Sequence, residues 1–213
     1  MISNKRRVFE ILGVVVTALG KFVFMDYLHW RFQFVATAIL IWGIYVFSQK
    51  RNQPKLLHYW GFRGDNFKSV ARFLIPFGLL AILGFLVVGF YKETLQINWH
   101  ILPILITYPI WGLIQQFLIM ALVAGNLEDL NTLKLPRFFI VLFTATLFSG
   151  VHYPQVWLII ATFVMALLYG FIYLKNRNLY ALGLFHGWLG AIFYYTVLGE
   201  NPFRDIFLKL FYS

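Results

Sequence analysis

Long apolar stretches, separated by short polar connections, repeat along the whole chain. A helix that crosses a bilayer needs about 20 apolar residues, and these stretches are too long and too uniformly apolar for the alternating strands of a membrane barrel. The predicted fold is therefore all-α, a polytopic membrane helical bundle. We predict about seven transmembrane helices, over residues 8–25, 32–48, 73–91, 101–124, 138–153, 155–174 and 179–198.

The longest polar stretch lies between the second and third predicted spans. Its second half follows turn signals at Gly61 and Gly64. Here we expect Asp65 to cap a short amphipathic interfacial helix that lies on the membrane before the third span. Residues 200–213 predict a short amphipathic tail. No internal repeat or linker is visible, so we expect one transmembrane domain over residues 1–213.

Composition supports this prediction, because only 12% of the residues are charged while 61% are hydrophobic. Soluble domains carry about 25% charged residues, so an ordinary soluble domain is excluded. The absence of cysteine excludes thiol catalysis, disulfides and thiolate metal sites. The first apolar stretch is interrupted by Glu10 and Lys21 and lacks a small-residue cleavage site, so we expect a retained span rather than a signal peptide.

The net charge of +10 follows the predicted topology. When the spans alternate from a cytosolic N-terminus, most of the 18 Lys and Arg residues fall in the cytosolic segments, as the positive-inside rule requires. We therefore expect the lipid bilayer, and no nucleic acid, as the partner of these charges. The expected location is a bacterial inner membrane, with the N-terminus in the cytosol.

Polar residues deep in a span are the functional candidates of a membrane protein. None of the eight carboxylates lies at the middle of a predicted span. The deep polar residues are instead Gln115, Gln116, His152 and His186. Each has an ordinary alternative, since paired glutamines often bond neighbouring helices and histidines near span ends are often interfacial. Two histidines without an acidic or thiolate partner make a poor metal site, so we expect no metal and no cofactor.

The order and spacing of these residues resemble the CPBP family of CAAX prenyl proteases, bacteriocin-processing enzymes and Abi-type membrane proteins. Phe148 and His152 match its FxxxH motif, and the stretch from Tyr173 to His186 matches the approach to its HxxxN motif. The resemblance covers about residues 55–198 and implies the fold of an intramembrane endopeptidase. In that family the first glutamate of EExxxR, helped by the first histidine, activates water, and the second histidine and the asparagine stabilise the oxyanion.

The chain departs from these motifs at four positions. Glutamines 115 and 116 replace the two glutamates, Met120 replaces the arginine and Gly190 replaces the asparagine. A neutral amide has no useful basicity near pH 7, whereas a buried glutamate does. An arginine without these carboxylates would be an unpaired buried charge. The replacements are therefore consistent with one another and argue against glutamate-based catalysis.

Three interpretations remain open. The first is a degenerate CPBP-family protein in which Gln115, Gln116, His152 and His186 face one cavity that binds a peptide, a lipid or a transmembrane helix, with weak or no proteolysis. The second is an active intramembrane peptidase whose two histidines position water. The third is a small-molecule or lipid transporter, or a binding protein, that shares the fold.

Overall fold

The computed structural model describes residues 2–204, and these residues form helices and connections without any strand. Three segments, η1, η2 and η3, are π-helical and directly continue α1, α5 and α9. The elements are α1 (Asn4–Gly20), η1 (Lys21–Tyr27), α2 (Arg31–Asn52), α3 (Leu56–Trp60), α4 (Phe67–Tyr91), α5 (Ile101–Gln116), η2 (Phe117–Gly125), α6 (Asn126–Glu128), α7 (Arg137–Gly150), α8 (Val156–Asn176), α9 (Leu179–Phe193) and η3 (Tyr194–Leu198).

Six of the described helices are long and apolar enough to cross a membrane, and they confirm the polytopic helical bundle. The predicted span at 138–153 corresponds to α7, which has only 14 residues. At 1.5 Å per residue this helix is about 21 Å long, shorter than the roughly 30 Å of a hydrocarbon core. Pro136 directly precedes its first turn, and the chain turns after Gly150. The seven predicted spans are therefore six long helices and one short one.

The polar stretch before the third span differs in detail from the prediction. A short helix, α3, comes earlier than expected, whereas the predicted amphipathic helix is the first part of the continuous helix α4. Asn66, and not Asp65, is the N-cap residue, and its side-chain oxygen accepts a hydrogen bond from Asn178 at 2.6 Å. The prediction that Asp65 caps this helix was therefore wrong. Most of the predicted C-terminal tail, residues 205–213, lies outside the described residues.

The chain divides into two compact units, each built from two separate stretches. Unit 1 contains Met1–Arg63 and Phe117–Arg177, and unit 2 contains Gly64–Gln116 and Asn178–Ser213. The expectation of a single transmembrane domain stays a prediction.

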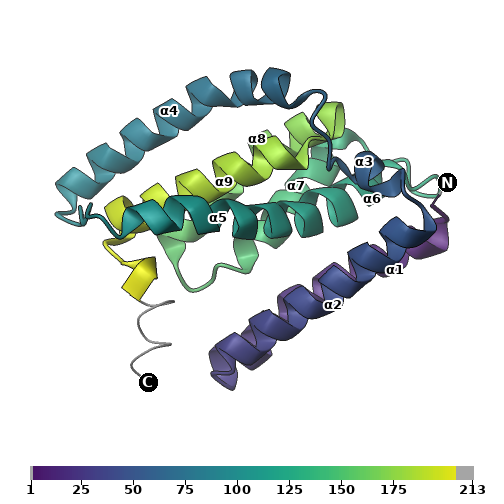
Figure 1. Ribbon diagram of the computed structural model, residues 1–213, viewed down its shortest axis with the longest axis horizontal. Helices are drawn as coiled ribbons and strands as arrows, with labels where there is room; N and C mark the ends of the chain where they lie inside the picture. The colour runs from purple at the N-terminus through teal and green to yellow at the C-terminus, as the bar shows by residue number, and fades with distance from the viewer. Residues whose placement is uncertain (1, 205–213) are drawn as a thin grey trace. The chain divides into compact units, whose positions relative to one another are not determined.

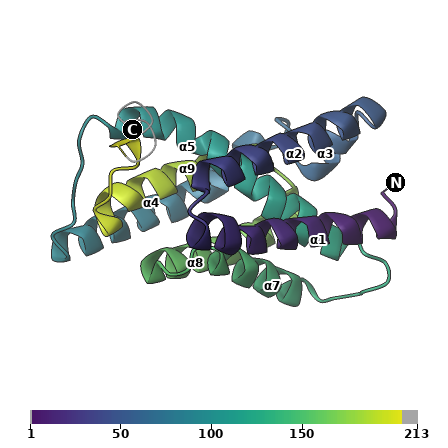
Figure 2. The same cartoon turned by 90° about the horizontal axis from the view of Figure 1, so that it is seen from below.

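Unit 1 contains two pairs of neighbouring helices. In the first pair, the Trp42 indole of α2 donates a hydrogen bond to the Thr17 hydroxyl of α1 at 3.2 Å. In the second pair, α7 and α8 lie side by side (Figure 2), and a Cβ added at Gly170 would come within 2.9 Å of the Val141 side chain. The π-helical segment η2 contacts α1, α7 and α8 and is buried at every residue except Leu118, so it forms the centre of this unit.

Unit 2 is organised around the pair α5 and α9, which run alongside each other (Figure 1). Their backbones touch at three glycines. A Cβ added at Gly112 would lie 2.5 Å from the Gly183 carbonyl oxygen, one at Gly183 2.6 Å from Leu113 Cα, and one at Gly187 2.3 Å from the Pro109 nitrogen. Small residues permit such close approach between membrane helices, and here no larger residue would fit.

Candidate functional site

Two of the predicted site residues meet in unit 2, where α5 packs against α9. The side-chain nitrogen Nε2 of Gln116 lies 2.9 Å from Nδ1 of His186. Both residues are buried. Because an amide NH2 group can only donate, Nδ1 of His186 accepts this bond, and a neutral His186 then carries its proton on Nε2. Glutamine and histidine are therefore hydrogen-bonded partners in the site.

The glycine contacts between the two helices explain why these side chains meet. Gln116 lies one helical turn after Gly112, and His186 lies between Gly183 and Gly187. Residues three and four positions apart share a face of a helix, so both polar residues lie on the face that carries the close contact. The amide oxygen of Gln116, Oε1, is buried and has no hydrogen-bond partner. Gln115 is adjacent on α5 and half-buried.

Position 190, where the CPBP motif has asparagine, has room for a side chain. A Cβ at Gly190 would lie 3.7 Å from the Tyr108 ring, which is ordinary van der Waals contact. The Tyr108 ring itself packs edge-on against Tyr194, with ring centroids 6.1 Å apart. Packing therefore does not require glycine at 190, in contrast to the glycines at 112, 183 and 187.

His152 lies in unit 1, in the turn after α7. Its Nδ1 is 2.8 Å from the backbone oxygen of Phe148, and the Phe148 ring packs edge-on against the imidazole. Since a carbonyl oxygen can only accept, Nδ1 carries the proton and Nε2 has the lone pair. Burial lowers the pKa of His152 most, the hydrogen bond to Phe148 opposes this, and the positive charge of Lys21 lowers the pKa as well, so that the net value is about 4. His152 is therefore neutral at pH 7 and can accept a hydrogen bond.

The structure thus brings together two of the four predicted residues, Gln116 and His186, with Gln115 beside them. His152 is positioned within its own unit by its FxxxH spacing, because Phe148 and His152 are one helical turn apart. That all four side chains face one cavity stays a prediction. Among the described residues, no group of three His, Cys, Asp or Glu side chains could hold a metal ion.

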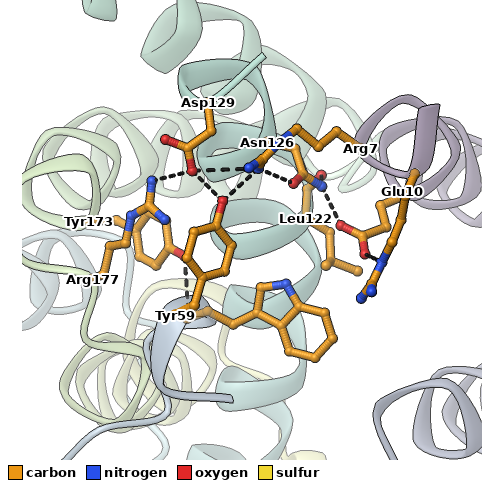
Figure 3. A network of polar contacts seen from close by, with 10 residues as sticks. Arg7, Glu10, Tyr59, Leu122, Asn126, Asp129, Tyr173 and Arg177 are labelled. Atoms are coloured by element: carbon orange, nitrogen blue, oxygen red, sulfur yellow. Dashed lines mark hydrogen bonds and ion pairs between the residues drawn. The ribbon is translucent and has the colours of Figure 1, made fainter. Parts of the chain in front are cut away.

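A second polar site, a buried ion network in unit 1, was missed by the sequence reasoning (Figure 3). Its first acceptor is Glu10 of α1, which accepts hydrogen bonds from Asn126 at 2.6 Å, from Arg6 at 2.9 Å and from Tyr45. The only sequence signal was that Glu10 interrupts the first apolar stretch. Glu10 is only 4% exposed and its partner Asn126 is fully buried.

The second acceptor of the network is Asp129, which follows α6. Its oxygen Oδ2 accepts from Arg177 at 2.7 Å, from Arg7 at 3.5 Å and from Tyr59. Burial and the hydrogen bond to Asp129 raise the pKa of the Tyr59 hydroxyl. Burial lowers the pKa of Arg177, but the hydrogen bond to Asp129 and the further interactions with Tyr173, Tyr59 and the Asp129 charge together outweigh it, so the pKa is raised. Both groups stay protonated near neutral pH and keep donating hydrogen bonds to Asp129. The network therefore links α1, α3, α6 and the end of α8.

The comparisons with known proteins agree with the motifs in α5 to α9. Residues 97–192 match the family of type II CAAX prenyl endopeptidase Rce1-like proteins. The CPBP resemblance is confirmed over this segment. No curated protein and no solved structure matches the chain. The Rce1-like segment contains all four predicted site residues. Residues 55–96 and 193–198, which the resemblance also included, lie outside it, and their assignment stays a prediction. The Rce1-like match and the six long apolar helices together identify a multi-pass membrane protein.

Proposed function

We propose that this chain is an Rce1-like membrane protein that binds a peptide, a lipid or a transmembrane helix at Gln115, Gln116, His152 and His186, with weak or no proteolysis. The observation that carries the proposal is the hydrogen bond between Gln116 and His186. Gln116, a neutral amide, stands where the CPBP motif has its second glutamate, and it is hydrogen-bonded to His186, the histidine of the HxxxN motif.

The chemistry of the remaining groups supports binding over hydrolysis. General-base catalysis works best with a group whose pKa lies near the working pH, and it typically contributes about 10²- to 10⁴-fold to the rate. A glutamine cannot take a proton at this pH. The lowered pKa of His152 makes its imidazole a weak base at neutral pH. Such groups donate and accept hydrogen bonds, which suffices to hold a ligand.

One observation favours a second candidate, an active peptidase that uses histidine to position water. His152 is neutral at pH 7 and its Nε2 lone pair can accept a hydrogen bond from a water molecule. This candidate predicts turnover in the unaltered protein that depends on His152.

A peptidase assay on purified, reconstituted protein separates the two candidates. The substrates are fluorogenic peptides with and without a C-terminal prenylated cysteine. We expect no turnover above the protein-free rate for the unaltered chain. For Gln115→Glu combined with Gly190→Asn we expect a rate about 10²-fold or more above the protein-free rate, since a Cβ at position 190 makes only ordinary van der Waals contact. Turnover by the unaltered protein that His152→Ala abolishes would overturn the proposal.

A binding assay with the same peptides tests the proposal directly. We expect saturable binding that weakens at least about fivefold in Gln116→Leu, which keeps the volume but removes the amide. Gly84→Ala is the matched control, because an added Cβ at Gly84 meets nothing within 4 Å. Equal affinity in both variants would contradict the proposed site.

A further inference from the structure

A lysine outside the Rce1-like segment contacts the turn that carries His152. Lys21 Nζ donates hydrogen bonds to the backbone oxygen of Tyr153 at 2.8 Å and to the Asp26 carboxylate at 2.7 Å. Tyr153 directly follows His152 in the chain. All of these residues belong to unit 1. The end of the first helix is therefore bonded to the turn on which a predicted site residue sits.

The π-helical geometry of η1 accounts for the position of the ammonium group. Lys21 and Asp26 are five positions apart. In an α-helix such residues point to different sides, whereas π-helical bonds join residues five apart and bring them into line. The segment Lys21–Tyr27 is π-helical and begins at this lysine. Its carboxylate partner anchors Lys21 while Nζ reaches the Tyr153 carbonyl.

The charge surroundings of His152 make Lys21 the cation that acts on it. Arg137, the only basic residue of α7, lies at the first residue of that helix, opposite the end that leads to His152. The first charged residue of α8 is Lys175, near the far end of that helix. Thr162, the α8 residue beside the imidazole, is neutral and lies 3.5 Å from Nδ1. Asp26 partly offsets the charge of Lys21. A nearby positive charge disfavours a second proton on the imidazole.

We propose that Lys21 is a positioning residue for His152: it holds the His152 turn through the Tyr153 carbonyl, and its positive charge adds to the effect of burial in disfavouring protonation at Nε2 of the imidazole, the lone pair that a ligand would meet. The functional meaning of this inference rests on the proposed function, because a ligand would meet His152 at that lone pair. The coupling itself concerns only the protein and is measured without a ligand.

The test is an NMR titration of the reconstituted full chain labelled at its histidine side chains. The His152 signal is identified by its loss in His152→Gln. We expect Lys21→Met to raise the titration midpoint by about one pH unit, equivalent to roughly tenfold tighter proton binding. Lys21→Arg, which keeps the charge and donors, is expected to leave it unchanged. The control Lys5→Met removes a lysine about 24 Å earlier along the same helix and is expected to leave it unchanged as well.

Asp26→Asn distinguishes a charge effect from a loosened turn. It removes the anchor of Lys21 but leaves the ammonium group without its counter-charge, so the midpoint should not rise. A rise in Asp26→Asn equal to that in Lys21→Met, or no rise in Lys21→Met, would overturn the inference. If Lys21→Met does not fold, Lys21→Gln serves instead, because it removes the charge and keeps a donor. Failure of the peptide assays would remove the proposed function and leave this titration result intact.

Discussion

Burial disfavours a positive charge on the imidazole of His152, and the stability of the folded protein therefore depends on pH. The pKa of His152 is about 4 in the folded protein, against an ordinary 6.5. Between these values the unfolded chain binds more protons than the folded one, so the free energy of unfolding rises with pH across this window. Stability is therefore lost as the pH falls from about 6.5 to about 4 and changes no further below it.

We expect this contribution to reach at most about 3 kcal/mol. Thermal unfolding in detergent at several pH values between 4 and 7 measures it. His152→Gln should lose this part of the pH dependence, and His58→Gln, which alters an exposed histidine, should retain it. An identical pH dependence in the unaltered protein and in His152→Gln would contradict the prediction.

Two neighbouring carboxylates, Glu128 and Asp129, should differ strongly in importance. Asp129 is part-buried, with its side chain 27% exposed, and accepts from three donors, one of which is the buried Arg7. Glu128 pairs with Arg137, whose side chain is 61% exposed. Removing one partner of a buried pair leaves the others uncompensated, while exposed pairs contribute little. We expect Asp129→Asn to lower the free energy of unfolding by about 3 kcal/mol and Glu128→Gln by less than about 1 kcal/mol. Denaturant unfolding of the two variants measures the difference. Equal losses of unfolding free energy would show that the ion network does not stabilise the fold more than the exposed pair does.

At the scale of elements, the pair α5 and α9 depends on where its glycines lie. Gly187→Ala would place a Cβ 2.3 Å from the Pro109 nitrogen, a backbone atom that moves only if the helices separate. Gly190→Ala would meet only the Tyr108 ring at 3.7 Å.

We expect Gly187→Ala to lose about 3 kcal/mol or more of stability, and Gly190→Ala to change it by less than about 1 kcal/mol, in either direction. Melting temperatures of the purified variants in one detergent compare them. Gly187→Ala should also break the Gln116–His186 hydrogen bond, so its peptide binding should fall with its stability. A Gly187→Ala variant as stable as Gly190→Ala would show that the backbones are further apart than described.

The elements also show what the sequence could and could not reveal. The six long spans could be predicted because each is a run of apolar residues long enough to cross a bilayer, which indicates a transmembrane helix. The length of the span at α7 was overestimated. Residues 151–153 directly follow its apolar sequence and were included in the span, although the chain already turns there. The Asp65 cap failed because two adjacent residues, Asp65 and Asn66, are both good cap formers. The π-helical segments carry no local sequence signal.

The candidate site was readable in part. The CPBP motifs predicted that Gln116 and His186 face one cavity together with Gln115 and His152, and the structure shows the hydrogen bond between Gln116 and His186. The ion network could not be predicted, since Glu10 and Asp129 find partners that are distant in sequence, such as Asn126 for Glu10 and Arg7 for Asp129. Long-range pairs of this kind follow from packing and not from local pattern.

At the scale of the whole molecule, the orientation in the membrane is the open prediction that is easiest to test. The chain has no cysteine, so single introduced cysteines report without background. We expect Lys50→Cys to be labelled from the cytosolic side and Lys92→Cys from the opposite side, because one span, α4, separates them and basic residues collect in the cytosol. Labelling of cells with a membrane-impermeant maleimide measures this, with Gly84→Cys within α4 as the unlabelled control. Labelling of both positions from one side would contradict the topology.

The three glycines between α5 and α9 have a mechanical consequence. Helices that touch through side chains can slide by exchanging rotamers, but helices that touch through backbone have no side chains between them to rearrange. Gln116 and His186 therefore cannot be drawn apart by small motions of the pair, and α5 and α9 should move as one rigid body. A ligand that reaches these two residues must gain access by motion of other segments, while the amide and the imidazole keep their spacing throughout.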